Sequence, residues 1–388
     1  VKSPGIPDTA PIVKRIRERG IPVISEIEFA GRYKGVAKTI CITGSNGKTT
    51  TTSLIYKIMR DAGRKVSLGG NIGESFAYSV ATEKNFWYVL ELSSFQLDGM
   101  TKFRADVGVL MNITPDHLDR YDYKFENYAA SKMRITQNQS SADAFIYSAD
   151  DDMTRQMLDK MDSSLRARQL PFAINTAIAS GDGDAVLEGY TFTASVGKQS
   201  VTIDTRKMQI HGMHNIYNAM AAALATLAAG VEPRVIKRSI YDFSPVEHRL
   251  EPAGEHNGIR WINDSKATNV DSVWYALESM QQPTVWIAGG TDKGNDYTPL
   301  KEFARRKVKA LICMGLDNAK LKRDFDGIIP VIEDCSSLDE AMRAAERHAT
   351  EGDTVLLSPA CASFDLFRNY EERGRLFKQW VKENILDK

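Results

Sequence analysis

One stretch decides the fold: Thr43-Gly44-Ser45-Asn46-Gly47-Lys48-Thr49-Thr50. It follows the short apolar run Thr39–Thr43 and precedes a segment whose apolar residues recur with helical spacing. Its glycines allow backbone N–H groups to converge on phosphate oxygens, and the start of a helix adds a positive dipole end. Lys48 would reach the terminal phosphates of a nucleotide, and the Thr49 hydroxyl would ligate Mg²⁺. Because Ile42 replaces the first glycine of the usual P-loop spacing, an ordinary strand-to-helix turn is the alternative.

Outward from this loop, apolar strands alternate with helical segments, which predicts a parallel sheet covered on both faces. Residues 180–210 alternate like antiparallel strands, and a long helix is expected from Met213 to Ala229. A second alternation begins near Ser244 and predicts a doubly wound sheet. The expected class is α/β, with a central P-loop-type ATPase domain and a C-terminal Rossmann-like domain. After a helix from Pro11, strands are expected at Ile21–Ile24, Trp87–Leu92, Val107–Met111, Ala144–Tyr147, Ile259–Ile262, Val285–Ala288, Ala310–Met314, Pro330–Ile332 and Val355–Leu357.

The composition excludes several classes of protein. The chain has 388 residues, with 50 basic and 50 acidic side chains and 43% hydrophobic residues, so it is neither disordered nor a polybasic nucleic-acid binder. No run reaches the ~20 apolar residues of a membrane span. The four cysteines are isolated, which is typical of reduced, buried thiols in a cytoplasmic protein. Only Cys361 lies in a polar loop, so a catalytic cysteine is the alternative there.

Further polar groups follow strands of the same predicted sheet. Glu91 lies at the end of Trp87–Leu92, where a carboxylate is well placed to hold Mg²⁺; an exposed strand-end glutamate is the alternative. His117 follows the next strand, and a lone histidine is more often structural than a ligand. Because strand ends converge on one crevice, we expect a functional role for His117. The Gly-rich turn Gly69–Gly73 also follows a strand, although such turns are common.

The second half of the chain adds polar residues near helix starts. Asn215 and Asn218 share a helix face, although Asn215 could simply cap that helix. Arg249 could clamp a phosphate, since its guanidinium matches phosphate geometry. Lys266 and Thr268 could receive a carboxylate substrate, although Thr268 would also suit a helix cap. Open α/β sheets bind ligands at strand ends, and three loops follow strands here: 263–269, 289–294 and 358–365.

The loop pattern Thr-Gly-x-Asn-Gly-Lys-Thr-Thr resembles that of the Mur ligase family, which joins amino acids to cell-wall precursors with ATP. Folylpolyglutamate synthetases share this loop. Other motifs are similar to the family members that add D-glutamate to UDP-N-acetylmuramoyl-L-alanine through an acyl phosphate. A folylpolyglutamate synthetase-like ligase and a non-catalytic ATP-binding module are the alternatives. The motifs are Gly70–Gly73, Leu90–Leu97, Asp264–Asn269 and Ser358–Gly374.

The resemblance also implies roles for single residues. Lys132, which the pattern alone would place on a solvated helix, matches a lysine that CO₂ carbamylates to hold a second Mg²⁺. Lys48, His117 and Lys132 would be catalytic, and Thr49, Glu91, His117 and Lys132 would serve two Mg²⁺ ions. ATP would contact Gly44 to Thr50, Asn215, Asn218, Arg249 and Asp264. D-Glutamate would contact Lys266, Thr268, Lys293, Ser363, Phe364 and Tyr370, and the muramoyl-alanine substrate would contact Asn71, Ser93 and Gln96.

Three domains are expected from the same resemblance. Residues 1–36 would be the closing part of an N-terminal UDP-binding domain, most of which is expected to be missing from this sequence. Residues 37–243 would form the ATP-binding domain, and residues 244–388 would form the amino-acid-binding domain. The expected partners are the two substrates and no nucleic acid, and the working form is expected to be a cytoplasmic monomer.

Overall fold

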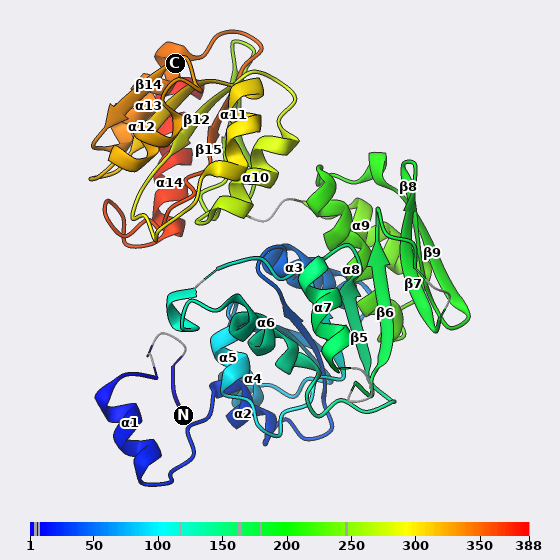
Figure 1. Ribbon diagram of the computed structural model, residues 1–388. Coiled ribbons are helices and arrows are strands. Elements are labelled where there is room, and N and C mark those ends of the chain that lie inside the picture. The colour runs from blue at the N-terminus through cyan, green and yellow to red at the C-terminus, as the bar shows by residue number, and fades with distance from the viewer. Residues whose placement is uncertain are drawn as a thin grey trace. The chain divides into compact units, whose positions relative to one another are not determined.

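The computed structural model describes residues 1–3, 6, 8–116, 118–161, 165–178, 181–244 and 247–387. These residues fall into two compact units, Val1–Ser244 and Pro245–Lys388. Each unit contains one sheet with helices packed on it (Figure 1). The predicted α/β class with two largely parallel sheets is therefore confirmed.

In the first unit, nine strands of the described chain form one sheet, in the order β2-β3-β1-β4-β5-β6-β7-β8-β9. Neighbours are parallel from β2 to β7, whereas β7, β8 and β9 pair antiparallel, as the alternation in residues 180–210 predicts. The strands are β1 (Lys38–Thr43), β2 (Val66–Gly70), β3 (Trp87–Glu91), β4 (Val107–Leu110), β5 (Ala144–Ser148), β6 (Arg168–Ala173), β7 (Gly183–Glu188), β8 (Thr191–Val196) and β9 (Gln199–Asp204).

Strand β1 is buried on both faces of this sheet. Cys41 packs in an apolar core with residues of α2, α4, α5 and α6, while the neighbouring Ile40 and Ile42 are fully buried as well. Such a continuous apolar run is typical of central parallel strands. The helices of this unit are α1 (Pro11–Glu18), α2 (Glu26–Gly31), α3 (Lys48–Asp61), α4 (Phe76–Thr82), α5 (Ser94–Asp98), α6 (Phe125–Met133), α7 (Asp152–Met161), α8 (Met213–Ala228) and α9 (Pro233–Tyr241).

The second unit has six strands among its described residues, in the order β10-β11-β15-β12-β13-β14. Neighbours are parallel except for β10, which pairs antiparallel with β11. The strands are β10 (Glu251–His256), β11 (Ile259–Asn263), β12 (Thr284–Ala288), β13 (Val308–Met314), β14 (Ile332–Cys335) and β15 (Thr354–Leu357), and the helices are α10 (Val270–Ser279), α11 (Lys301–Lys307), α12 (Ala319–Phe325), α13 (Leu338–His348) and α14 (Tyr370–Val381).

Helices cover both faces of this second sheet, as predicted for a doubly wound fold. Along β12, Trp286 and Ala288 pack in a core with α10, α11 and α12. Val285 and Ile287 alternate with them and pack in a second core with α13 and α14 (Figure 1). This period-2 alternation distributes the apolar side chains over two cores.

Two strand predictions were wrong. Residues Ile21–Ile24 form no strand, because Pro22 has no N–H to donate to a ladder and Ile21 is exposed. The strand expected at Pro330–Ile332 begins only at Ile332 and continues to Cys335, again leaving the proline outside. Helix α14 and strands β6 and β10 had no prediction at all.

The buried-helix and thiol predictions are confirmed. Residues 219–227 of α8 are buried, and all four cysteines are free and buried. Burial raises the pKa of the Cys361 thiol to about 11, which keeps this sulfur protonated and argues against a nucleophilic role. Over the part of the chain that the structure describes, no helix combines the length and apolar character needed to cross a membrane.

Candidate functional site

The loop between β1 and α3 has the geometry of a phosphate loop. Gly47 caps α3 in the left-handed region, with φ of 80°, which favours glycine over any other residue. A Cβ atom at this position would lie 2.5 Å from Asn218 Oδ1, so the side chain of α8 leaves room only for glycine. Helix α3 therefore begins directly at Lys48, with its first N–H groups at the loop.

Two predicted metal ligands meet beside this loop. Thr49 Oγ1 donates to Glu91 Oε2 at 2.7 Å, and the Glu91 side chain is buried. The other oxygen of Glu91 accepts from Asn71 Nδ2 at 2.8 Å. The structure therefore brings Thr49, Glu91 and Asn71 together, and an exposed strand-end glutamate is the wrong interpretation of Glu91.

Lys48 and Lys132 converge on one backbone carbonyl. Lys48 Nζ donates to the carbonyl oxygens of Gly44 and Ser45, both at 2.8 Å, and Lys132 Nζ donates to the Gly44 oxygen at 2.7 Å. Lys132 is only 2% exposed and lies 4.5 Å from the centre of the Tyr128 ring. The interpretation of Lys132 as a solvated helix lysine is therefore wrong.

The environment of Lys132 disfavours its charged form. Burial, followed by the nearby positive charge of Lys48, holds the pKa of the Lys132 amine well below its usual value. The carboxylates of Asp116, Asp98 and Glu91 act in the opposite direction. A neutral amine at this position retains its lone pair, which a nucleophilic amine needs.

A residue without a predicted role, Asn112, pins the phosphate loop. Its Oδ1 accepts from the Asn46 backbone N–H at 2.9 Å, and its Nδ2 donates to the Asn46 carbonyl at 3.2 Å. The Ser45 N–H donates to the Asn112 carbonyl at 3.0 Å. The one sequence signal for Asn112 is its position just after strand β4. His117, predicted as catalytic and metal-binding, lies outside the described residues.

Asn215 and Asn218 lie at the start of α8 and form one chain of hydrogen bonds. Asn215 Nδ2 donates to the His211 carbonyl at 2.8 Å, and Asn218 Nδ2 donates to Asn215 Oδ1 at 3.0 Å. Gly212 is the N-cap of α8, so the capping interpretation of Asn215 is wrong. The buried hydroxyl of Thr50 has no hydrogen-bond partner among the described residues.

Ser93 and Gln96, expected on the muramoyl-alanine side, have a structural role. The Ser93 hydroxyl accepts from the Gln96 N–H at 3.3 Å, and Gln96 Oε1 accepts from the Ser93 N–H at 3.0 Å. These two bonds are a capping box at the start of α5. Substrate binding by these residues stays a prediction.

In the second unit, three loops lie together at the carboxyl ends of β11, β12 and β15. The Asp264 N–H donates to the Leu357 carbonyl at 2.8 Å, and the Ala360 N–H donates to the Ala267 carbonyl at 2.9 Å. Thr291 and Ala362 exchange two backbone hydrogen bonds, at 2.8 and 3.2 Å. The convergence expected for parallel strand ends is therefore present.

Asp264 is buried between these loops. Ser358 Oγ donates to it at 2.8 Å, and the Leu250 N–H donates at 3.2 Å. Burial raises the pKa of Asp264 to about 6, although the charge of Arg249 acts in the opposite direction. The buried Nε of Arg249 has no hydrogen-bond partner among the described residues. An unsatisfied buried donor of this kind is available to an anionic ligand.

The residues predicted to contact D-glutamate lie on these loops and on α14. Lys266 Nζ is 5.2 Å from the centre of the Tyr370 ring. Thr268 directly precedes Asn269, which is the observed N-cap of α10, so Thr268 is not that cap. The remaining three differ in exposure: Ser363 is buried, whereas Lys293 and Phe364 are exposed.

Arg373 is a buried residue of the second unit for which the sequence predicted no role. It lies on α14 and is fully buried, donating to Ser265 Oγ at 3.0 Å and to the Ser265 carbonyl at 2.9 Å. Longer contacts of 3.4 Å join it to the Cys361 carbonyl. Burial lowers the pKa of its guanidinium to about 10. No local pattern marks Arg373, because its partners are distant in the sequence. Ser265 lies 108 residues earlier and Cys361 lies 12 residues earlier.

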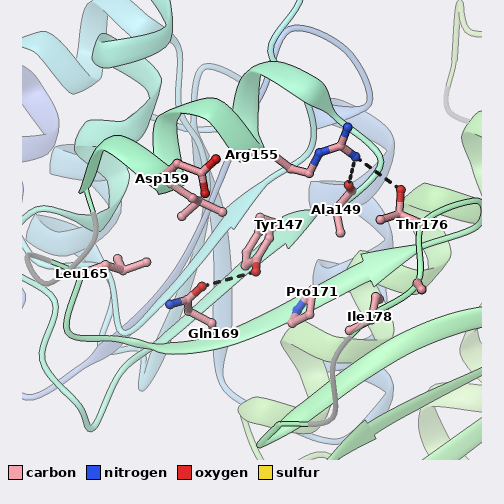
Figure 2. A pocket seen from close by; sticks show the side chains of 11 residues that line it. Tyr147, Ala149, Arg155, Asp159, Leu165, Gln169, Pro171, Thr176 and Ile178 are labelled. Atoms are coloured by element: carbon pink, nitrogen blue, oxygen red, sulfur yellow. Dashed lines mark hydrogen bonds between the residues drawn. The ribbon is translucent and has the colours of Figure 1, made fainter.

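Two other features stand apart from the predicted site residues. Ligand atoms of Glu247, His248 and Glu251 lie within 4.8 Å of one another, but Lys378 Nζ already bonds both carboxylates, at 2.6 and 2.8 Å. A cavity of about 600 Å³ lies between α7 and strands β5 and β6, lined by Tyr147, Arg155 and Gln169 among others (Figure 2). None of the residues that line this cavity belongs to the predicted site.

Two family models match the chain. The Mur ligase middle domain matches residues 42–226, and the Mur ligase, glutamate ligase domain matches residues 248–361. The first match spans the phosphate loop, Glu91 and Lys132. The second match spans Arg249, Asp264 and the whole of loops 263–269 and 289–294.

Curated relatives are similar over almost the whole chain. UDP-N-acetylmuramoylalanine–D-glutamate ligase of Bacteroides fragilis is 53% identical over 384 residues, which cover 99% of this chain and 85% of the relative. The protein of the same name from Christiangramia forsetii is 49% identical over 382 residues, which cover 98% of this chain and 84% of the relative. That from Salinibacter ruber is 42% identical over 388 residues, covering 98% and 84%.

Solved structures share the fold at low sequence identity. MurF from Acinetobacter baumannii matches with a TM-score of 0.70 and 17% identity, covering 92% of this chain and 79% of that one. MurC from Thermotoga maritima matches with a TM-score of 0.65 and 16% identity, covering 98% and 84%. The two domain matches and the curated relatives agree with the phosphate loop and the fold, and the chain belongs to the Mur ligase family.

Proposed function

We propose that this protein is an ATP-dependent ligase that adds D-glutamate to UDP-N-acetylmuramoyl-L-alanine, a step in peptidoglycan precursor synthesis. The observation that carries the proposal is the phosphate loop with Thr49 bonded to the buried Glu91 beside it. The names of the curated relatives, at about 50% identity, supply the substrates.

The residues around the loop fit Mg²⁺ and a nucleotide. A threonine hydroxyl and a carboxylate are oxygen donors of the kind that Mg²⁺ prefers, and Asn71 fixes the second oxygen of Glu91. The Thr50 hydroxyl, which has no partner in the described part of the chain, and the tight approach of Gly47 to α8 fit a loop that binds an anion. When bound, Mg²⁺ would offset phosphate charge at this position.

The proposed chemistry has two steps. A carboxylate oxygen of the alanyl group attacks the γ-phosphorus of ATP, the bond from that phosphorus to the bridging oxygen breaks, and ADP leaves. The neutral amine of D-glutamate then attacks the acyl phosphate carbon, and the nitrogen loses a proton as the amide bond forms. The bond from that carbon to the phosphate oxygen breaks, and phosphate leaves. Lys48 and the N–H groups at the start of α3 would stabilise charge on the transferred phosphoryl group.

We further propose that Lys132 is carbamylated. Its neutral amine would attack the carbon of CO₂ and lose a proton, giving an anionic carbamate in place of the amine. The burial of Lys132 and its place at the Gly44 carbonyl support this assignment, since a carbamate there would supply oxygen ligands beside the loop. A second Mg²⁺ would be held by these oxygens.

The two parts of the chain would divide the work. We assign ATP binding to residues 37–243 and amino-acid binding to residues 244–388, an assignment that the two domain matches support. Since one chain carries both the phosphate loop and the predicted glutamate loops, we propose a monomer as the working form. The use of ATP and a nucleotide-linked precursor implies the cytoplasm as its location.

The test is phosphate release with purified protein, ATP and Mg²⁺. We expect release only when UDP-N-acetylmuramoyl-L-alanine and D-glutamate are both present, with a product whose mass has increased by one glutamyl residue. Turnover with another amino acid but not with D-glutamate would overturn the substrate assignment. Folate-dependent ADP formation would favour a folylpolyglutamate synthetase-like ligase, and ATP binding without any turnover would favour a binding module.

A further inference from the structure

A polar cluster built around two buried residues, Tyr297 and Cys361, joins two of the loops predicted to receive D-glutamate. We use the name loop cluster for Asp292, Asn295, Tyr297 and Cys361. The first three follow β12, in and beyond the loop that carries Lys293, and Cys361 lies in the loop that carries Ser363. None of the four belongs to the predicted site residues.

The Tyr297 hydroxyl uses its full hydrogen-bonding capacity in this cluster. It donates to Asp292 Oδ2 at 2.8 Å and accepts from Asn295 Nδ2 at 3.2 Å. Cys361 Sγ lies 3.2 Å from the same oxygen. Because the single hydroxyl hydrogen points to the carboxylate, the thiol is the donor in this last contact. One donor and two acceptor positions are therefore all occupied.

Asp292 closes a turn around Lys293. Its Oδ1 accepts from the backbone N–H of Gly294 at 2.6 Å and of Asn295 at 3.1 Å, which is an Asx-type turn. Lys320 Nζ lies 3.4 Å from the same oxygen and offsets its charge. The backbone on both sides of the exposed Lys293 is therefore held in place. The other carboxylate oxygen of Asp292 accepts from the fully buried Tyr297.

The same cluster holds the second loop. Asn295 Nδ2 donates to the Ala360 carbonyl at 3.0 Å, and Ala360 adopts φ of 60°, in the left-handed region that alanine rarely occupies. Thr291 and Ala362 add a pair of backbone hydrogen bonds beside it. The cluster thus fixes the loop of Lys293 relative to Ala360 and Cys361, in the loop that carries Ser363.

We propose that Tyr297 and Asp292 are positioning residues, which set the affinity for D-glutamate by holding the Lys293 loop and the Ser363 loop in one register. This inference rests on the proposed function, since it takes D-glutamate as the ligand of these loops. In this role neither residue needs to touch the substrate. Their effect would pass through the backbone of the two loops, whose separation decides whether cationic and hydroxyl groups can meet one amino acid at once.

The test uses Tyr297→Phe, which removes one oxygen atom and keeps the ring packed against Phe325. The change removes the contacts of the hydroxyl with Asp292, Asn295 and Cys361. A net weakening of site order equivalent to one hydrogen bond corresponds to about tenfold in affinity, so the KM for D-glutamate should rise about tenfold. The KM values for ATP and for UDP-N-acetylmuramoyl-L-alanine should stay unchanged. Tyr190→Phe is the matched control, because Tyr190 is exposed and lies in the first unit.

The outcomes separate this inference from the proposed function. Wild-type protein without D-glutamate-dependent phosphate release would overturn the proposed function itself. Active wild-type protein together with an unchanged D-glutamate KM in Tyr297→Phe would overturn only the positioning role. An equal rise in all three KM values would also overturn it, as a general loss of structure. If Tyr297→Phe fails to fold, Asp292→Asn is measured in the same assay with the same criteria.

Discussion

Single buried polar residues in this protein are matched to partners that lie far away in the chain. Glu28, on α2, accepts from three successive backbone N–H groups, those of Thr101, Lys102 and Phe103, at 3.0, 2.9 and 2.8 Å. Burial alone would raise the pKa of Glu28, but these three donors outweigh it and lower the pKa to about 2. The carboxylate therefore fastens α2 to the segment before β4.

Glu28→Gln should destabilise the protein in a pH-dependent way. Because the folded pKa of about 2 lies below the ordinary value of 4.5, the stabilisation is fully present above pH 4.5 and is lost as the pH falls toward 2. We expect a loss of about 2 kcal/mol in the free energy of unfolding at pH 7, shrinking below pH 4.5. Urea unfolding at several pH values measures this, with the exposed Glu126→Gln as control. A difference that does not vary with pH would contradict the account.

Lys132→Ala should lower turnover by at least about a hundredfold, since the proposed carbamate would hold the second Mg²⁺ that offsets charge on the transferred phosphoryl group. Formate or acetate should partly restore the activity, because either offers a carboxylate of similar size. Lys124→Ala, near the start of the same helix and exposed, is the control. Full activity of Lys132→Ala without added carboxylate would rule out the carbamate.

At the scale of elements, the phosphate loop depends on the segment that follows β4 as well as on β1 and α3. Strands β1 and β4 are parallel neighbours, so the loop after β1 and the residues after β4 meet at one edge of the sheet. Asn112 uses this proximity to bond both backbone groups of Asn46. The residue after strand β4 thus fixes the backbone of the phosphate loop.

Asn112→Ala should weaken nucleotide binding while the fold remains. Two hydrogen bonds to the Asn46 backbone are lost, so we expect the KM for ATP to rise about tenfold. The KM for D-glutamate should not change. Steady-state kinetics measure both values, and the exposed Asn175→Ala is the control. An unchanged KM for ATP in a folded Asn112→Ala protein would contradict the proposed support of the loop.

At the scale of the whole molecule, each of the two units has its own sheet and its own buried cores. Unfolding of such a chain need not be a single transition, so a ligand is expected to shift the transition of the unit that binds it. The phosphate loop lies in the first unit, and the predicted glutamate loops lie in the second.

Saturating ATP with Mg²⁺ should therefore stabilise the unit of residues 1–244. At a ligand concentration a hundred times the dissociation constant, the gain is about 2.7 kcal/mol. Thermal unfolding measures the shift, and removal of Mg²⁺ with EDTA should abolish most of it, as should Lys48→Ala. An equal shift in ATP with EDTA would show that the Thr49 and Glu91 oxygens hold no metal.

The sequence predicted the parts of the site whose geometry is local. A glycine-rich turn was expected between an apolar strand and a helix, and Glu91 was expected at the end of a strand of the same sheet; the structure contains both. The local pattern gave a wrong strand prediction at Ile21–Ile24. Its apolar residues suggested a strand, but Pro22 has no N–H group to donate to a neighbouring strand. Local patterns also could not separate a substrate role for Ser93 and Gln96 from the capping box that the structure contains.

By itself, then, the sequence determined the α/β class, the position of the phosphate loop and the family resemblance, because strand and helix periods and turn glycines act over a few residues. Only the tertiary structure decided that Lys132 is buried against Gly44, that Asn112 pins the loop, and that Tyr297 joins two loops of the second unit. The physical reason is that a buried polar group must find its partner wherever packing brings one, and sequence distance does not limit that choice.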